Sequence, residues 1–236
     1  MDRQLYDLAG ANPEFRFSPY CWRSRLALMH KGLRTEFLPW RFTEKDKIAF
    51  SGQGRVPVLV DGGRVVADSW NIALHLETTY PDAPSLFGGP QAQALARFVN
   101  GWADSVQLPG LSRLVLADIV PALHEGDVEY FLRSRQERFG MPVEAVCAGR
   151  EREVETFRAN LAPLRLLLRN QPFVCGEAPA YADYIVFGGF QWARCVSDFP
   201  VLAADDVVAE WVERMLDHAG PQARDMPKLR RVQNPL

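Results

Sequence analysis

The chain has 236 residues, of which 47% are hydrophobic, and its 27 basic and 29 acidic side chains leave a formal net charge of −2. This near-neutral balance does not indicate a nucleic acid or an anionic membrane as partner. No apolar run approaches the length of a membrane-spanning helix, and the first residues hold no signal-peptide core. We therefore expect a globular cytoplasmic protein, large enough for two domains, with no membrane partner.

The first elements are a short buried strand over residues 4–8 and a helix that begins at Ser18-Pro19. Ser18 is a favourable N-cap, and Pro19 suits the first helical position, where a missing N–H costs nothing. We expect this helix to be amphipathic and to end near Gly32, since apolar residues recur in it at helical spacing: Trp22, Leu26, Met29 and Leu33. The start of such a helix favours a bound anion or thiolate.

The following segments complete a small α/β unit. Residues 35–40 predict a second strand, which makes a βαβ unit with parallel strands, and residues 40–55 predict a loop or short helix. Residues 55–60 and 64–67 flank the turn Asp61-Gly62-Gly63 and predict an antiparallel hairpin. Asp68-Ser69 then predicts the cap of another helix.

Beyond residue 80 strand signals largely disappear. A segment rich in proline and glycine follows over residues 80–89, and Pro90 opens a long helical pattern. Further helices are predicted over 127–140, from Pro142 to 168 with a kink or split at Pro163, and around 207–216. The basic tail from Met226 predicts a solvated end. The fold class is therefore α/β followed by all-α.

Several motifs resemble known thiol-handling proteins. Ser18-Pro19-Tyr20-Cys21 is similar to the glutaredoxin dithiol motif with serine in place of the first cysteine. Together with Arg55-Val56-Pro57 and Asp68-Ser69, it resembles the glutathione site of the glutathione transferases, and looks most like the bacterial β-etherase-type enzymes and their fungal relatives. This resemblance implies a thioredoxin-like domain over residues 1–81, a linker over 82–89 and an all-helical domain over 90–236, with Ala180 to Tyr184 at the start of its central helix.

The resemblance also implies roles for individual residues toward glutathione as cosubstrate. Ser18 would donate a hydrogen bond to the thiolate, and Val56, before a proline that is typically cis in this fold, would pair with the cysteinyl amide. Asp68 and Ser69 would hold the γ-glutamyl end. Four residues are candidates for the glycyl carboxylate, and the sequence does not choose among them: Arg41, Lys45, Gln53 and Arg55.

Cys21 offers an alternative chemistry, because a thiol near a helix N-terminus could form a mixed disulfide with glutathione and act as a thioltransferase or deglutathionylase. It occupies the resolving position of the motif, so we expect it to be packed and inert. The other cysteines are widely spaced, and we expect free thiols. No metal-binding pattern occurs, and we expect no metal site.

The acceptor pocket is expected between the two domains, against the helical half. Aromatic residues that could line it, each of which could equally be core, are Tyr20, Trp22, Trp40, Trp102 and Trp192. We expect a homodimeric transferase in which the glutathione thiolate attacks an aromatic electrophile. Cleavage of a β-aryl ether is the most specific version of this prediction. The alternative is a protein of low turnover that binds glutathione and aromatic ligands.

Overall fold

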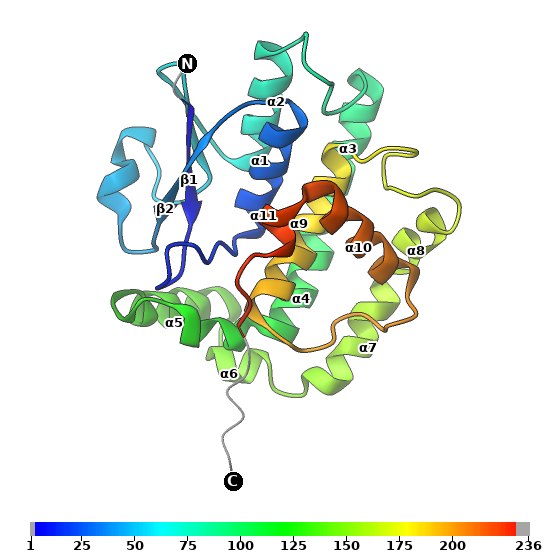
Figure 1. Ribbon diagram of the computed structural model, residues 1–236. Coiled ribbons are helices and arrows are strands. Elements are labelled where there is room, and N and C mark those ends of the chain that lie inside the picture. The colour runs from blue at the N-terminus through cyan, green and yellow to red at the C-terminus, as the bar shows by residue number, and fades with distance from the viewer. Residues whose placement is uncertain (1–2, 230–236) are drawn as a thin grey trace.

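The computed structural model describes residues 3–229 (Figure 1). Four strands form one sheet: β1 (Arg3–Leu8), β2 (Glu36–Trp40), β3 (Val58–Asp61) and β4 (Arg64–Ala67). Their order is β2-β1-β3-β4, with β1 and β2 parallel and the other neighbours antiparallel. Leu5 of β1 is in register with Phe37 of β2 and with Leu59 of β3. The predicted βαβ unit and hairpin are therefore confirmed.

Three helical segments accompany the sheet, and the first of them is central to the molecule. They are α1 (Pro19–His30), the 3₁₀ helix η1 (Lys45–Ser51) and α2 (Ser69–Thr79). The expectation that α1 is amphipathic is wrong, because every residue from Cys21 to Leu28 is buried. Figure 1 shows the reason, since α1 lies between the sheet and the long helix α9 (Tyr181–Val196).

Buried ion pairs allow α1 to carry charged residues inside the protein. Arg25 donates to Asp7 of β1 over 2.6 Å, and Arg23 pairs with Asp104 over 2.9 Å. Both arginines are at least nine-tenths buried. A buried charge is tolerated where such a partner compensates for lost hydration, so α1 is tied to the sheet on one side and to the helical half on the other.

The rest of the chain is helical. Its segments are α3 (Pro90–Trp102), the π-helical turn η2 (Ala103–Gln107), α4 (Leu108–Val115), the 3₁₀ helix η3 (Leu116–Ala122), α5 (Glu125–Phe139), α6 (Val143–Val146), α7 (Arg150–Asn160), α8 (Ala162–Leu168), α9, α10 (Val207–Ala219) and α11 (Pro221–Arg224). The helix expected from Pro142 is split rather than kinked at Pro163, which lies in the first turn of α8. A further break at Gly149, whose φ is 78°, was not expected.

Helix α9 runs through the middle of the helical half, and most of its residues are buried. Its Gly188 allows the backbones of α9 and α1 to approach closely, because a Cβ at this position would lie 2.5 Å from the Pro19 carbonyl oxygen. Asp183 in its first turn accepts hydrogen bonds from the N–H groups of Val174, Cys175 and Ala180 and from Trp211 Nε1, at 2.7–3.2 Å. The start of α9 is therefore fixed although Ala180 offers no side-chain acceptor.

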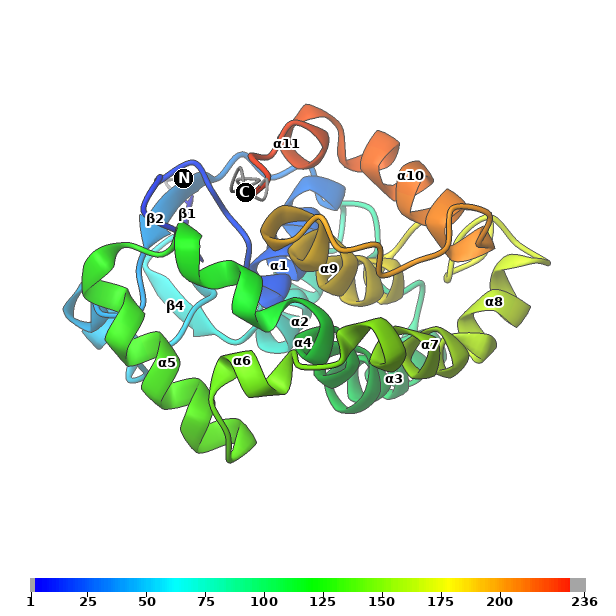
Figure 2. The same cartoon turned by 90° about the horizontal axis from the view of Figure 1, so that it is seen from below.

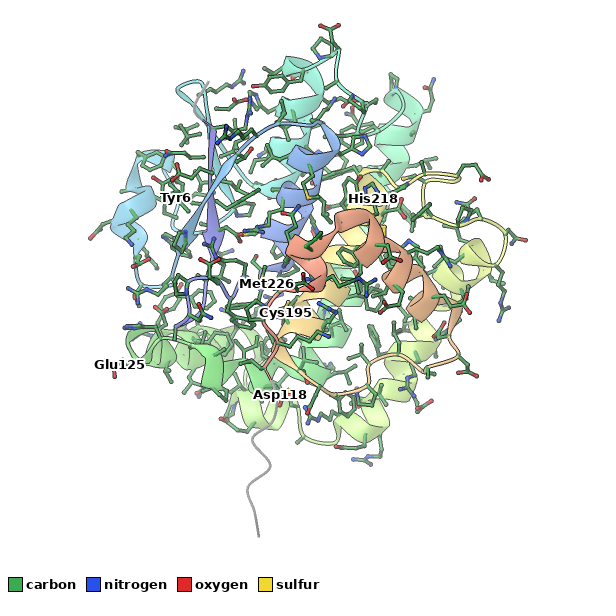
Figure 3. All side chains as sticks on the ribbon, viewed as in Figure 1. Tyr6, Asp118, Glu125, Cys195, His218 and Met226 are labelled. Carbon is green, nitrogen blue, oxygen red and sulfur yellow. The ribbon has the colours of Figure 1, made fainter. Side chains whose placement is uncertain are left out.

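Two expectations concern the ends of the fold. Met226, which Figure 3 labels together with Cys195, is buried. Its sulfur accepts the Arg16 N–H, and the Leu229 N–H donates to the Cys195 carbonyl. The prediction of a solvated end is therefore wrong for Met226, whereas Pro227 and Lys228 are exposed and Leu229 is half-buried. The basic pair at 230–231 lies outside the described residues. Residues 80–89, between α2 and α3, contain no helix or strand. The predicted domain limits stay a prediction.

All four cysteines are free thiols, as expected. Among the helices of residues 3–229, none combines the length and apolar character needed to cross a membrane. The cytoplasmic location stays a prediction.

Candidate functional site

A cleft of about 1100 Å³ lies between the sheet half and the helical half. Residues of both halves line it, from the connection after β1 and the start of α1 to α4, α5 and α9. Such a volume is at the upper end for small-ligand sites. Figure 2 shows α5 on the side of the molecule where the strands lie, apart from α7, α8 and α10. The cleft therefore has an N-terminal wall and a C-terminal wall of different origin.

Ser18 is the N-cap of α1 and lines the cleft. Its Oγ accepts the Cys21 N–H at 3.3 Å, so its hydroxyl proton is left to donate. The Trp22 N–H is bonded to the Ser18 carbonyl, and Pro19 has no N–H. Within residues 3–229 the Tyr20 N–H has no hydrogen-bond partner. The start of α1 thus presents a hydroxyl and the positive end of a helix to the cleft.

The segment before β3 forms the second part of the N-terminal wall. Gln53, Arg55, Val56 and Pro57 all line the cleft, and the Val56–Pro57 peptide bond is cis, as the resemblance implied. Arg55 is exposed, whereas Pro57 is buried. Two predicted polar candidates and the predicted backbone contact are therefore brought to one edge of the cleft.

Asp68 and Ser69 form the third part of this wall, at the start of α2. Asp68 Oδ1 caps the helix by accepting the N–H groups of Trp70 and Asn71 at 3.0 and 3.1 Å. Its φ of 78° lies in the left-handed region, which non-glycine residues rarely occupy and which often marks functional positions. Asp68 Oδ2 accepts no hydrogen bond within residues 3–229, so one carboxylate oxygen is available to a ligand.

Two of the predicted basic candidates are not cleft residues. Arg41 does not line the cleft, and its guanidinium is paired with Glu44 at 2.7 Å. Lys45 is exposed and places its Nζ 4.7 Å from the ring centroid of Tyr130, at the margin of the cleft. Both residues lie in a polar segment after β2, where residue spacing does not indicate which side chains face the cleft.

Cys21 lies outside the cleft and is completely buried. Burial, and next the negative charge of Asp7, raise the pKa of its thiol well above the ordinary value. A raised pKa means that the reactive thiolate is scarce at neutral pH. The expectation that Cys21 is a packed residue agrees with this position.

The five aromatic candidates divide into two groups. Tyr20, Trp40 and Trp192 line the cleft. Trp22 does not, since it is buried and its Nε1 donates to the Arg16 carbonyl at 3.1 Å. Trp102 lies half-buried on α3, outside the cleft.

Tyr20 is a polar group of the cleft as well as an aromatic one. Burial, and then the charge of Asp104, raise the pKa of its hydroxyl, and the Arg23 guanidinium lies 4.7 Å from its ring centroid. The phenol therefore stays protonated near neutral pH and can donate a hydrogen bond.

The C-terminal wall contains residues that sequence reasoning missed. The connection after β2 adds Phe42 to the cleft. Helix α5 contributes aromatic and basic side chains, namely Tyr130, Phe131, Arg133, Arg135, Arg138 and Phe139. The available signal was the spacing of four, four and three residues from Asp127 to Phe131, Arg135 and Arg138, which places these side chains on one helix face. Because that face mixes charge with aromatic rings, it does not give a simple hydrophobic periodicity.

Helix α5 is held in place by a long-range contact. Asp127 Oδ1 accepts the N–H and the hydroxyl of Thr43 at 3.0 and 2.7 Å. Thr43 follows Phe42, so this contact joins the segment that carries Trp40 and Phe42 to the helix that carries Tyr130. Across residues 3–229, no group of three or more His, Cys, Asp or Glu side chains is arranged to hold a metal.

Two stretches of the chain match domains of one family. Residues 17–79 match the glutathione S-transferase N-terminal domain, and residues 94–218 match the glutathione S-transferase C-terminal domain. The chain belongs to the glutathione S-transferase family. The two matched stretches contain the two walls of the cleft, so the site described above lies where both domains of the family meet.

Individual relatives agree with this assignment. A glutathione S-transferase-like protein of Aspergillus flavus is 31% identical over 141 residues, which are 54% of this chain and 50% of that protein. The chain thus spans about half the length, or less, of the first relatives that it matches in sequence. The β-etherase-type resemblance stays a prediction.

Solved structures show the same fold over nearly the whole chain. A glutathione transferase from Phanerochaete chrysosporium superimposes with a TM-score of 0.81 at 22% identity, covering 91% of this chain and 96% of that one. A glutathione S-transferase of Ceriporiopsis subvermispora, crystallised with glutathione, gives 0.74 at 24% identity, covering 96% and 95%. The predicted thioredoxin-like sheet domain followed by a helical half is confirmed.

Proposed function

We propose that this protein is a glutathione transferase whose N-terminal cleft wall binds glutathione and whose Ser18 hydroxyl stabilises the thiolate. The observation that carries this proposal is the meeting of Ser18, Pro57, Asp68 and Ser69 at one cleft. These groups come from three separate segments of the sequence. The family assignment and the structural relatives crystallised with glutathione support the same ligand.

Each part of the N-terminal wall suits one part of an extended tripeptide. Asp68 Oδ2 would accept the γ-glutamyl ammonium, while Ser69 and the first N–H groups of α2 would bind the neighbouring carboxylate. The Val56 backbone would pair with the cysteinyl amide as an added strand does. Gln53 and Arg55 would hold the glycyl carboxylate, because they line the cleft whereas Arg41 and Lys45 do not.

Ser18 would act on the thiol itself. A free thiol has a pKa near 8.5, so only a few per cent is ionised at pH 7. Lowering this pKa by about 1.5 units takes roughly 2 kcal/mol, which a hydroxyl donor and a helix N-terminus can supply together. The thiolate sulfur would form a bond to an electrophilic carbon, and the leaving group would depart with its bonding electron pair.

The acceptor would occupy the remainder of the cleft, where Tyr20, Trp40 and Trp192 are joined by Phe42 and Tyr130. Aromatic walls favour an aromatic electrophile. Cleavage of a β-aryl ether, in which a phenolate is the leaving group, is the specific reaction that we propose. Turnover of an aryl ether separates this enzyme from a glutathione-dependent carrier of aromatic ligands, because a carrier binds both ligands but forms no thioether product.

The Cys21 alternative has less support. A thioltransferase needs a thiolate that the substrate disulfide can reach. Cys21 is completely buried and the pKa of its thiol is raised, so it offers neither access nor charge.

A second copy of this chain is the partner that we propose. Leu95 and Phe98 of α3 are 69% and 74% exposed and lie one turn apart on the same helix face. Large apolar side chains on one face often mark a protein interface. Sedimentation should show a dimer for the wild type and a monomer for a Leu95→Asp, Phe98→Asp double variant. A wild type that sediments as a monomer would contradict the proposal.

Calorimetric titration with reduced glutathione tests the proposed function. Asp68→Asn is the informative variant, since asparagine keeps the capping oxygen and tolerates positive φ but lacks the charge. The loss of a charged hydrogen bond, about 1.5–3 kcal/mol, predicts a dissociation constant roughly 10–100 times higher. Asp205→Asn, at an exposed position outside the cleft, is the matched control. Absence of glutathione binding to the wild type would refute the proposal.

A further inference from the structure

Two arginines of α5 face the cleft from its C-terminal wall. Arg135 and Arg138 are one turn apart and both line the cleft. The guanidinium carbon of Arg135 lies 4.7 Å from the ring centroid of Phe131 and 5.4 Å from that of Phe42. Its charged plane is thus held against aromatic rings, in the arrangement of a cation–π contact.

Neither arginine has an acidic partner in the part of the chain that the structure describes. Within residues 3–229, Arg135 and Arg138 form no ion pair, and the side-chain hydrogen bond of Arg135 goes to the Ser134 hydroxyl at 3.0 Å. Glu137, an exposed acid of the same helix at the cleft, forms no ion pair with them. Burial, and then the positive charges of Arg138 and Arg55, lower the pKa of Arg135 to about 10. The wall therefore carries uncompensated positive charge.

The proposed position of glutathione leaves these two arginines unused. Its carboxylates would be held at Ser69 and at Gln53 and Arg55 of the opposite wall, and its ammonium at Asp68. The acidic Asp104 at the cleft is already paired with Arg23. Arg135 and Arg138 lie instead beside the aromatic side chains assigned to the acceptor.

Resting on the proposed function, we propose that the acceptor is an aromatic electrophile bearing a carboxylate, which Arg135 and Arg138 bind while its ring lies against the half-buried Phe42 and Tyr130. A guanidinium binds a planar carboxylate through two parallel hydrogen bonds and stacks on aromatic rings, so both parts of such a molecule match this wall. A neutral aromatic compound would leave the two charges without a counter-ion.

A matched pair of inert probes tests this inference without requiring turnover. The probes are naphthoate and its neutral methyl ester, titrated calorimetrically into the full chain in the presence of S-methylglutathione. We expect the carboxylate to bind at least about tenfold more tightly than the ester, the ratio that one charge-assisted hydrogen bond gives. The preference should shrink as salt is added.

Three substitutions locate the charge preference. Arg135→Met keeps an apolar stem over Phe131, and Arg138→Gln changes an exposed position with little risk to folding. In each variant the preference for the carboxylate should fall to within about threefold, while glutathione affinity is unchanged. Arg169→Gln, an exposed arginine of the helical half outside the cleft, removes the same charge and should keep the full preference.

Turnover gives a second readout with reactive probes, para-chloro-meta-nitrobenzoate and its methyl ester. Glutathione sulfur bonds to the ring carbon, chloride leaves with the carbon–chlorine electron pair, and the thiol proton passes to solvent. We expect kcat/KM to favour the acid over the ester more in the wild type than in Arg135→Met.

The outcomes separate this inference from the proposed function. Equal binding of the two inert probes, or a preference that survives both cleft substitutions, overturns the inference. If glutathione still binds in that case, the proposed transferase stands. Weakened glutathione binding in Arg135→Met and Arg138→Gln would also overturn it, since the arginines would then serve glutathione.

Discussion

The two walls of the cleft differ in how the chain positions them. On the N-terminal wall, Ser18 and Asp68 are helix caps whose hydrogen bonds reach only two or three residues along the chain. On the C-terminal wall, α5 depends on the contact between Asp127 and Thr43, which are 84 residues apart. The N-terminal wall therefore depends on short local sequence motifs, whereas the C-terminal wall depends on long-range tertiary contacts.

The largest expected effect concerns the contact that joins the two walls. In Gly188→Ala the new Cβ meets the Pro19 carbonyl oxygen at 2.5 Å, a backbone atom that cannot move aside cheaply. We expect the free energy of unfolding to fall by about 2–3 kcal/mol in urea denaturation, as for other overpacked cores. Gly101→Ala, in α3 with no atom near the new Cβ, should instead raise stability by about 0.5–1 kcal/mol. Equal effects of the two substitutions would contradict the close packing.

The next effect probes the N-terminal wall. Without its hydroxyl donor, Ser18→Ala should raise the pKa of the bound glutathione thiol by about one unit, or 1.4 kcal/mol. With the thiol pKa raised from about 7 to about 8, the thiolate fraction at pH 7 and the rate that depends on it should fall about fivefold, and the rate should recover at higher pH. The pH–rate profile measures this shift. Ser18→Thr, which keeps a hydroxyl, is the control, and a profile that Ser18→Ala leaves unmoved would remove Ser18 from the chemistry.

A smaller effect is expected on the C-terminal wall. Thr43→Val removes one donor from the buried Asp127 carboxylate, which should destabilise the packing of α5 by about 1 kcal/mol. Hydrogen exchange of the α5 amides should quicken while exchange in the β-sheet stays as it was. Thr78→Val, which removes a hydroxyl bonded only to its own helix backbone, should leave α5 unaffected. Slowed or unchanged exchange in α5 would mean that its position does not depend on Thr43.

No effect is expected at Cys21. Because its thiol is completely buried and has a raised pKa, oxidised glutathione should leave it unmodified in the native protein near neutral pH. Peptide mass spectrometry detects the adduct, with urea-unfolded protein as the positive control. A mixed disulfide on native Cys21 would restore the thioltransferase alternative.

The same contrast explains what the sequence could and could not predict. Helix caps and the β-hairpin follow from local sequence patterns, so the sequence predicts the elements that carry Ser18, Pro57 and Asp68 correctly. Which face of a helix meets the cleft depends on distant packing. For that reason Trp22 and Trp102 were included although they lie outside the cleft, and the arginine face of α5 was missed.

The burial of α1 on all sides has a consequence for protein synthesis. The sheet, α1 and α2 leave the ribosome long before α9, whose last residue is Val196. Until α9 arrives, the surface of α1 that contacts it is exposed to water and to other nascent chains, and Arg23 lacks the Asp104 carboxylate. A truncated gene that ends before α3 should therefore yield an aggregating product, so the thioredoxin-like half is not an independent module that could be transplanted alone.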